Sequence, residues 1–245
     1  MSGHSKWSTI KRKKGAADAK RGKMFTKLIK EITIAAREGG GDAGANPRLR
    51  LAIDNAKAAN MPADNIDRAI KKATGELEGV TYTEITYEGY APCGVAMLIE
   101  VATDNKNRSV AEVRHIFSKY NGSMGESGSV AWMFDRKGII TFPIQNKTED
   151  EIMDIVLEAG AEDLQTEEDY FEVQTDLESF EPVRKALVAA DMQIENASLQ
   201  WIAKNTVNVS GDDLEKVMKI IEAMEDSDDV QNVYSNADFD EDSIQ

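Results

Sequence analysis

Hydrophobic residues recur at helical spacing through the first third of the chain. Residues 24–37 and 47–59, and the run from Ile66 to Ala73, carry apolar residues three or four positions apart, which predicts three amphipathic helices. Glycines follow the first and third runs, as is common at helix ends, and Pro62 suits the first turn of the third. No strand pattern interrupts them, so we expect a small helical domain.

Beyond residue 80 the pattern predicts alternating strands and helices. The expected strands are 84–90, 94–103, 129–134, 139–143, 161–166, 170–175, 194–202, 205–209 and 229–235. The expected helices are 110–120, 149–159, 180–190 and 212–225. Thr148 and Glu151 form a capping-box pattern before the second of these helices, and Ser210 can cap the last one.

The order of these elements predicts the fold class. Residues 139–202 form one βαββαβ set, and the segments on either side supply a second set that the first interrupts. We therefore predict an α + α/β multidomain fold, with a three-helix domain followed by two ferredoxin-like α/β domains, one inserted in the other. The predicted domains are residues 1–76, residues 77–137 with 204–245, and the insert 138–203.

Charge is divided unevenly between the two ends of this architecture. Residues 1–76 hold 17 Lys/Arg and 8 Asp/Glu, a net charge of +9, whereas the remaining residues hold 12 and 36, a net charge of -24. A basic block on an acidic body indicates a polyanionic partner that one end contacts and the other avoids. The alternative is a solvated tail that only aids solubility, although added acidic residues serve that purpose better.

The sequence offers little that resembles a catalytic, metal or membrane site. His4 and His115 are the only histidines, Cys93 is the only cysteine, and no phosphate-loop or dinucleotide pattern occurs, so we expect no enzyme and no cofactor. Acidic residues at 226, 228 and 229 lack the remainder of a calcium loop, which favours solvated charge. Apolar runs are far shorter than the roughly 20 residues that span a bilayer. We expect a cytoplasmic protein without a secretory signal, membrane partner or small-molecule substrate.

The opening segment combines positive charge with aromatic rings. His4 and Trp7 lie among basic residues, and aromatic rings can stack on nucleobases while lysines and arginines neutralise phosphates. Nothing in the segment reads a base sequence, because phosphate contacts position a protein without specifying a site. The predicted nucleic-acid-binding residues are Lys6, Trp7, Lys11, Arg12, Lys13, Lys14, Lys20, Arg21, Lys23 and Lys27.

A second candidate lies in the glycine-rich stretch 121–129. It follows a helix and precedes a strand, which is the reverse of the order that directs backbone amides and a helix dipole at phosphate. A flexible loop is one interpretation, and a contact with a polyanion or another partner is the other. The contact residues would be Gly122, Met124, Gly125 and Gly128.

Several stretches resemble one protein family. They are GHSKWSTIKRKKGAADAKRGKMFTKLIKEI near the start, NPRLRLAIDNAKAANMPADNIDRAIKKATG at 46–75, YEGYAPCGVA at 87–96, TDNKNRSVAEVR at 103–114 and GSVAWMF at 128–134. Together they resemble the YebC/PmpR family, which includes a mitochondrial translational activator, over essentially the whole chain. The resemblance implies a helical N-terminal domain followed by two α/β domains, one inserted in the other. Ala43-Gly44, Ala91 and Cys93 depart from the family pattern only in loops.

The resemblance also implies a role in gene expression. Members are described as probable DNA-binding transcriptional regulators, and others resemble ribosome-associated factors that assist elongation through difficult sequences such as proline runs. We expect a non-enzymatic regulator that binds nucleic acid through its basic N-terminal domain, with ribosomal RNA or the ribosome as the alternative partner to DNA. A scaffold that binds no nucleic acid would leave the division of charge unexplained.

Overall fold

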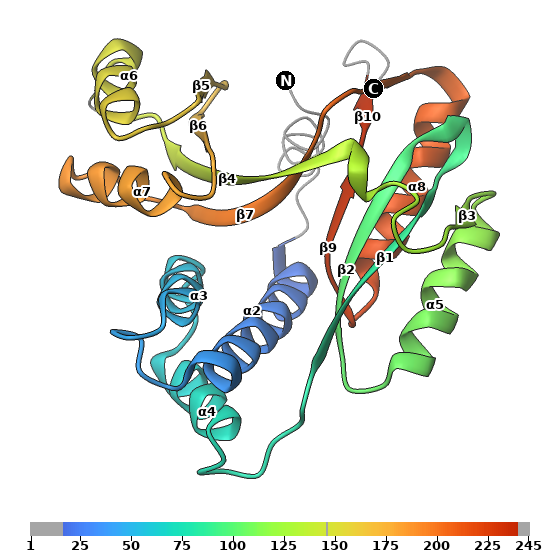
Figure 1. Ribbon diagram of the computed structural model, residues 1–245, viewed down its shortest axis with the longest axis horizontal. Coiled ribbons are helices and arrows are strands. Elements are labelled where there is room, and N and C mark those ends of the chain that lie inside the picture. The colour runs from blue at the N-terminus through green and yellow to red at the C-terminus, as the bar shows by residue number, and fades with distance from the viewer. Residues whose placement is uncertain (1–16, 146, 240–245) are drawn as a thin grey trace.

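The computed structural model describes residues 17–145 and 147–239, and the side chains from residue 21 onward. Within these residues the chain forms seven α-helices and ten strands, arranged as three lobes (Figure 1). We call them the helical lobe (α2–α4), the outer lobe (β1–β3, α5, β8, α8, β9 and β10) and the inserted lobe (β4–β7, α6 and α7). Each lobe has its own cluster of buried apolar side chains.

The helical lobe packs three helices around small side chains. They are α2 (Ala17–Gly39), α3 (Pro47–Ala58) and α4 (Ala63–Ala73). Ile32 and Leu49 are fully buried, and most of the remaining core consists of alanines, which allow the helix axes to approach closely. The side chain of buried Asn46 accepts a hydrogen bond from Leu49 N, which caps α3, and donates to Ala35 O at 2.7 Å in α2.

The outer lobe is a four-stranded antiparallel sheet with two helices on one face. Its strands lie in the order β3-β1-β2-β9, and α5 and α8 cover the face that carries the largest apolar cluster. A separate parallel pair joins β8 to β10. The elements are β1 (Thr83–Tyr90), β2 (Ala96–Thr103), α5 (Lys106–Lys119), β3 (Ser123–Met124), β8 (Val207–Val209), α8 (Gly211–Asp226), β9 (Val230–Ser235) and β10 (Ala237–Phe239).

The inserted lobe is a complete βαββαβ unit. Its sheet has the antiparallel order β5-β6-β4-β7, and α6 and α7 pack on one face. The predicted capping box forms, because Thr148 accepts from Glu151 N and the Glu151 carboxylate accepts from Thr148 N. The elements are β4 (Phe134–Pro143), α6 (Glu149–Glu158), β5 (Asp163–Thr166), β6 (Tyr170–Thr175), α7 (Phe180–Ala189) and β7 (Asn196–Ala203).

The prediction of a mixed helical and sheet fold of several lobes is confirmed. The predicted strand composition of the second ferredoxin-like sheet is wrong. The expected strand 129–134 is largely a 3-10 turn at Ala131–Met133, and β4 begins only at Phe134. The expected strand 205–209 becomes β8, which pairs with β10 outside the four-stranded sheet. The hairpin partner β1 takes a central place in that sheet instead. Ser210 precedes α8 without a side-chain capping bond.

The β4–β7 ribbon joins the inserted lobe to the rest of the chain. Its strands pair from Phe134–Ala203 to Thr141–Asn196, so β4 runs without a break across the predicted boundary between 137 and 138. The buried side chain of Phe134 and the partly buried Trp201 pack on the face of the outer sheet opposite α5 and α8. The domain boundaries themselves stay a prediction.

Candidate nucleic-acid interface

The predicted basic site lies mostly before the described residues. Lys6, Trp7, Lys11, Arg12, Lys13 and Lys14 precede residue 17, and Lys20 lies in α2 where the side chain is not described. Arg21, Lys23 and Lys27 occupy the first turns of α2. Arg21 is exposed, and its guanidinium lies 5.5 Å from the centre of the Phe25 ring. The described part of the site is therefore the start of α2.

Three lysines along one face of α2 contact the outer lobe. Lys23, Lys27 and Lys30 are four and three residues apart, which is the spacing of one helix face. Lys23 Nζ lies 2.9 Å from Asp226 Oδ1 and 3.1 Å from Asp226 O. Lys27 Nζ donates to the backbone oxygens of Glu225 and Gln231 at 3.3 Å. We call these lysines the lysine stripe; it lies against the turn between α8 and β9.

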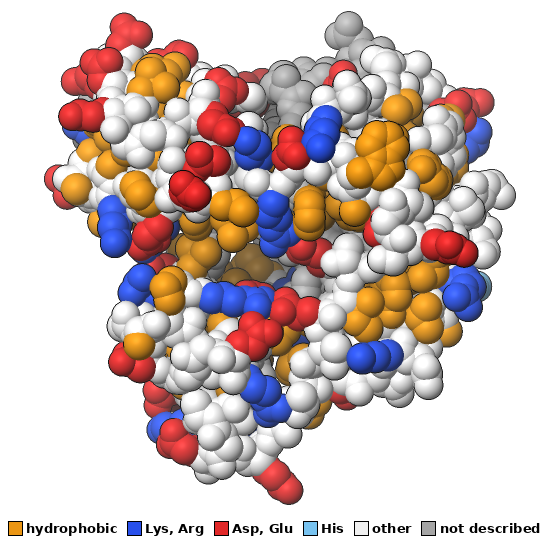
Figure 2. Space-filling view, viewed as in Figure 1, with side chains coloured by type: hydrophobic (Ala, Val, Ile, Leu, Met, Phe, Trp, Pro, Cys, Tyr) orange, Lys and Arg blue, Asp and Glu red, His pale blue; other side chains and the backbone are white. Residues whose placement is uncertain are grey.

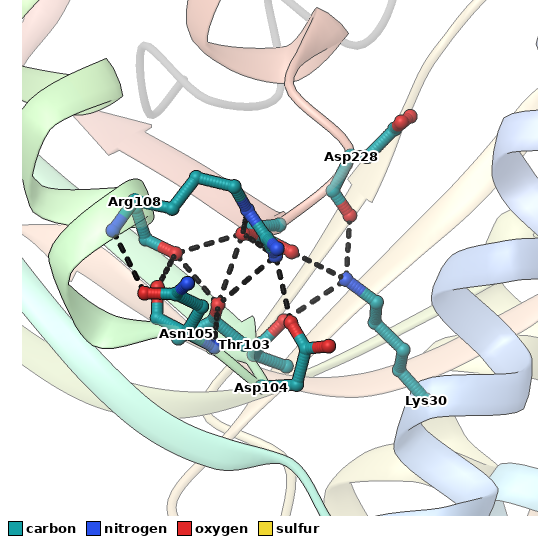
Figure 3. A network of polar contacts seen from close by, with 9 residues as sticks. Lys30, Thr103, Asp104, Asn105, Arg108 and Asp228 are labelled. Atoms are coloured by element: carbon teal, nitrogen blue, oxygen red, sulfur yellow. Dashed lines mark hydrogen bonds and ion pairs between the residues drawn. The ribbon is translucent and has the colours of Figure 1, made fainter. Parts of the chain in front are cut away.

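Lys30 ends the lysine stripe in a buried network around Asp229 (Figure 3). Lys30 Nζ lies 3.0 Å from Asp229 Oδ1, and it also donates to Ala102 O at 2.9 Å and Asp228 O at 2.7 Å. The other carboxylate oxygen of Asp229 accepts from Thr103 and Ser109 hydroxyls at 2.9 and 2.7 Å and from Arg108 Nη2 at 2.7 Å. All four donors point at one carboxylate.

This network keeps Asp229 ionised although it is buried. Burial raises the pKa of Asp229, but the hydrogen bonds from Arg108, Ser109, Lys30 and Thr103 outweigh it and hold the pKa at about 2. The expectation that acidic residues here are simply solvated is therefore wrong for Asp229. Its carboxylate connects α2 to the end of β2, the start of α5 and the start of β9.

Arg48 at the start of α3 forms a second connection between the helical and outer lobes. Its guanidinium lies 2.9 Å from Glu31, 2.8 Å from Glu38 and 2.6 Å from Glu84 of β1. Burial lowers the pKa of Arg48, but the bonds to Glu84 and Glu31 raise it well above its ordinary value. Lys30 therefore ties α2 directly to the outer lobe, and Arg48 links the second half of α2 and the start of α3 to β1.

The helical lobe also contacts the inserted lobe. Arg184 of α7 lies 3.0 Å from Asp54 of α3, and the Asn55 amide donates to Ala197 O at 2.8 Å on the edge strand β7. A cleft of about 550 Å³ lies beside these contacts, with Leu51 and Val188 among its lining residues. The helical lobe thus bridges the other two.

Figure 2 shows acidic side chains gathered over the lobe of α6 and α7 on the face in view.

The backbone amides of the glycine-rich stretch bind a carboxylate side chain of this same protein, that of Glu88. The Glu88 carboxylate of β1 accepts hydrogen bonds from the backbone N–H groups of Gly128, Val130 and Ala131 at 2.6, 2.7 and 2.8 Å. Burial raises the pKa of Glu88, but these three donors outweigh it and lower the pKa below its ordinary value. Gly122, Met124 and Gly125 lie alongside β1, where Gly125 N donates to Glu88 O. The structure therefore favours an anchored loop over a flexible one.

Comparisons with known proteins place this geometry in a family. A family model described as "TACO1/YebC protein N-terminal domain" matches residues 5–76, and one described as "TACO1/YebC second and third domain" matches residues 82–237. The chain belongs to the TACO1/YebC family. The resemblance inferred from the sequence is confirmed over nearly its whole length.

Similar proteins carry regulatory names rather than enzyme names. A "probable transcriptional regulatory protein" of Chlorobaculum parvum is 59% identical over 98% of this chain and 96% of its own length. One of Desulfatibacillum aliphaticivorans is also 59% identical, over 100% and 99% of the two chains. The crystal structure of a conserved hypothetical protein from Aquifex aeolicus has a TM-score of 0.87 and 45% identity, covering 94% and 95% of the two chains. The curated relatives are thus named as probable transcriptional regulatory proteins and not as enzymes.

The stretches that carried the family resemblance build the contacts described above. TDNKNRSVAEVR supplies Thr103, Arg108 and Ser109 to the Asp229 carboxylate, and Asn105 caps α5 by accepting from Arg108 N. GSVAWMF supplies the three amides that bind Glu88. In these two TACO1/YebC stretches, polar side chains and backbone amides hold the lobes and the loop in place.

The structure describes two of the remaining sequence candidates, His115 and Cys93. His115 is exposed on α5, and Cys93 is exposed in the turn between β1 and β2. A hydrogen bond to Asp213 raises the pKa of the Cys93 thiol, which opposes the formation of a reactive thiolate. Over residues 17–145 and 147–239, no group of three His, Cys, Asp or Glu side chains is placed to hold a metal ion. No helix in this described part of the chain is long and apolar enough to cross a membrane.

Proposed function

We propose that this protein regulates gene expression by binding nucleic acid, in the first instance DNA, through the basic segment that leads into α2. The observation that carries the proposal is the division of charge, with a net +9 over residues 1–76 and a net -24 over the rest. A phosphate backbone is attracted to the first part and repelled by the second, so the charge orients the protein on a nucleic acid.

The contacts of α2 support this orientation. The helix that continues from the basic segment is fixed to the outer lobe directly by Lys30–Asp229, and indirectly through Arg48, which pairs with Glu31 and Glu38 of α2 and with Glu84 of β1. Because α2 is fixed, the proposed binding segment joins the rest of the protein at a fixed point beside the outer lobe. We also propose that residues 1–76, residues 77–137 with 204–245, and residues 138–203 act as three domains, of which the first makes the nucleic-acid contact.

A charge-neutralising variant tests the proposal on the full chain. Substitution to glutamine at four positions of the basic segment should abolish most binding to a 40-base-pair duplex at low salt, because four phosphate contacts are lost. The four positions are Lys11, Arg12, Lys13 and Lys14. The matched control makes the same substitution at four lysines of the outer and inserted lobes and should bind like the wild type. These are Lys106, Lys119, Lys147 and Lys185.

The partner is identified by running the same variants on isolated ribosomes. Duplex binding that depends on the basic segment supports the DNA regulator. Retention on ribosomes at physiological salt, with weak duplex binding, moves the proposal to the translational alternative. Equal loss of duplex binding in both sets of variants shows that binding depends only on net charge. That result contradicts the proposal that the basic segment is the binding site.

A further inference from the structure

The lysine stripe is buried at one end and exposed at the other. Lys30 and Asp229 each expose 7% of their side chains, whereas Lys23 and Asp226 expose 44% and 76%. Exposed ion pairs contribute little to stability and are screened by salt. Buried pairs are screened much less. The contact between α2 and residues 225–229, which we call the acidic segment, is therefore firm at Lys30 and weak at Lys23.

The acidic segment offers Lys23 a negatively charged oxygen, as a phosphate would. Asp226 presents a carboxylate oxygen and a carbonyl oxygen to the Lys23 ammonium at 2.9 and 3.1 Å, and Glu225 presents a carbonyl oxygen to Lys27. The Asp226 carboxylate oxygen resembles a phosphate oxygen in charge, and its 2.9 Å distance from Lys23 Nζ is that of a charge-assisted hydrogen bond. Lys23 and Lys27 were both expected to bind phosphates, yet here they bind the protein itself.

We propose that the acidic segment competes with nucleic acid for the start of α2, so that a phosphate backbone must displace Asp226 from Lys23 to engage the lysine stripe. This inference rests on the proposed function and adds an internal competitor to the same site. Displacement opens only the first turns of α2, because the Lys30–Asp229 pair holds the helix beyond them. The protein thus binds nucleic acid more weakly than its basic segment alone would allow.

Two aspartates in the acidic segment form a matched pair for testing this competition. Asp226 binds Lys23 through its carboxylate. Asp228 accepts from Lys30 only through its backbone oxygen, and its carboxylate points away from the network (Figure 3). Within the described residues the Asp228 carboxylate forms no ion pair. Substituting either by asparagine removes one negative charge from nearly the same place.

The test measures binding of the D226N and D228N full chains to a 40-base-pair duplex and to inorganic polyphosphate at low salt. Removing a competing exposed ion pair should tighten binding by about two- to fivefold in D226N. D228N removes the same charge but no ion pair among the described residues, and should change affinity by less than half as much. Hydrogen exchange of residues 223–229 in the wild type should accelerate when polyphosphate binds, while that of β2 stays unchanged.

Each result has one interpretation. Tighter binding in D226N than in D228N supports the competition. Equal affinities in the two variants, or no change in exchange on binding, overturn it, as does failure of every variant to bind polyphosphate. If polyphosphate binding distinguishes the variants while no nucleic acid binds, the proposed function fails and the internal competition stands.

Discussion

Replacing Asp229 by asparagine should weaken the fold through the loss of one carboxylate. The ordinary pKa of 3.8 falls to about 2 in the folded protein, a difference worth about 2.4 kcal/mol of stability at neutral pH. Asparagine keeps the shape but leaves the buried Lys30 ammonium with only two carbonyl acceptors. Adding that desolvation cost, we expect D229N to lower the free energy of unfolding by about 2 to 4 kcal/mol.

The loss of stability in D229N should depend on pH. Because the folded pKa lies below the unfolded one, the contribution is complete above about pH 5 and disappears as the pH falls through 2. Between pH 7 and pH 3 the difference between wild type and D229N should therefore shrink by about 1 kcal/mol. Urea unfolding followed by circular dichroism at both pH values measures it, with D228N as the control that should match the wild type.

Two outcomes would refute this reasoning about Asp229. One is a D229N protein as stable as the wild type at pH 7, which would mean that the four donors contribute nothing. The other is a stability difference that stays constant between pH 7 and pH 3, which would place the folded pKa of Asp229 at its ordinary value.

The other predictions concern the anchored loop and the insert. Glu88→Gln should lower the free energy of unfolding by about 1 to 3 kcal/mol and accelerate hydrogen exchange at residues 125–131, because a neutral amide oxygen binds three N–H donors poorly. The control is Glu126→Gln on the exposed surface of the loop, which should change neither quantity. Deleting residues 138–199 and joining Lys137 to its strand partner Gln200 through Asn-Gly should leave the outer lobe folded, since the remaining ribbon can close in a two-residue hairpin. Amide spectra of the deletion protein that show global collapse would contradict the domain proposal.

Local patterns in the sequence predicted most elements of this fold. The apolar spacing of residues 47–59 became α3, and the Thr148–Glu151 capping box opened α6 as expected. The errors lie where pairing partners are distant in sequence. Residues 205–209 look like any short strand, and only the chain returning at Ala237–Phe239 assigns them to a separate pair. Strand propensity says nothing about which sheet receives a strand.

The polar anchors were missed for a related reason. Glu88 occurs in an ordinary strand, and nothing near it reveals that a loop forty residues later supplies three amides. Asp229 was interpreted as one of several solvated acids. The sequence did contain a signal for the Asp229 network. Asp229 directly precedes the strand β9, and Thr103-Asp104-Asn105 lies at the end of the strand β2. Antiparallel pairing of β2 with β9 brings these ends together, as the bond from Ala102 N to Asp229 O shows.

The salt dependence of duplex binding tests most directly whether the basic segment contacts phosphates. Each phosphate contact contributes about 0.9 to the slope of log affinity against log salt. Glutamine at Lys11, Arg12, Lys13 and Lys14 should therefore reduce the magnitude of the slope by about 3.6 relative to the wild type. The control substitutions at four lysines of the other lobes should leave the slope unchanged. A slope that is the same in the wild type and the four-glutamine protein would contradict the proposed nucleic-acid interface.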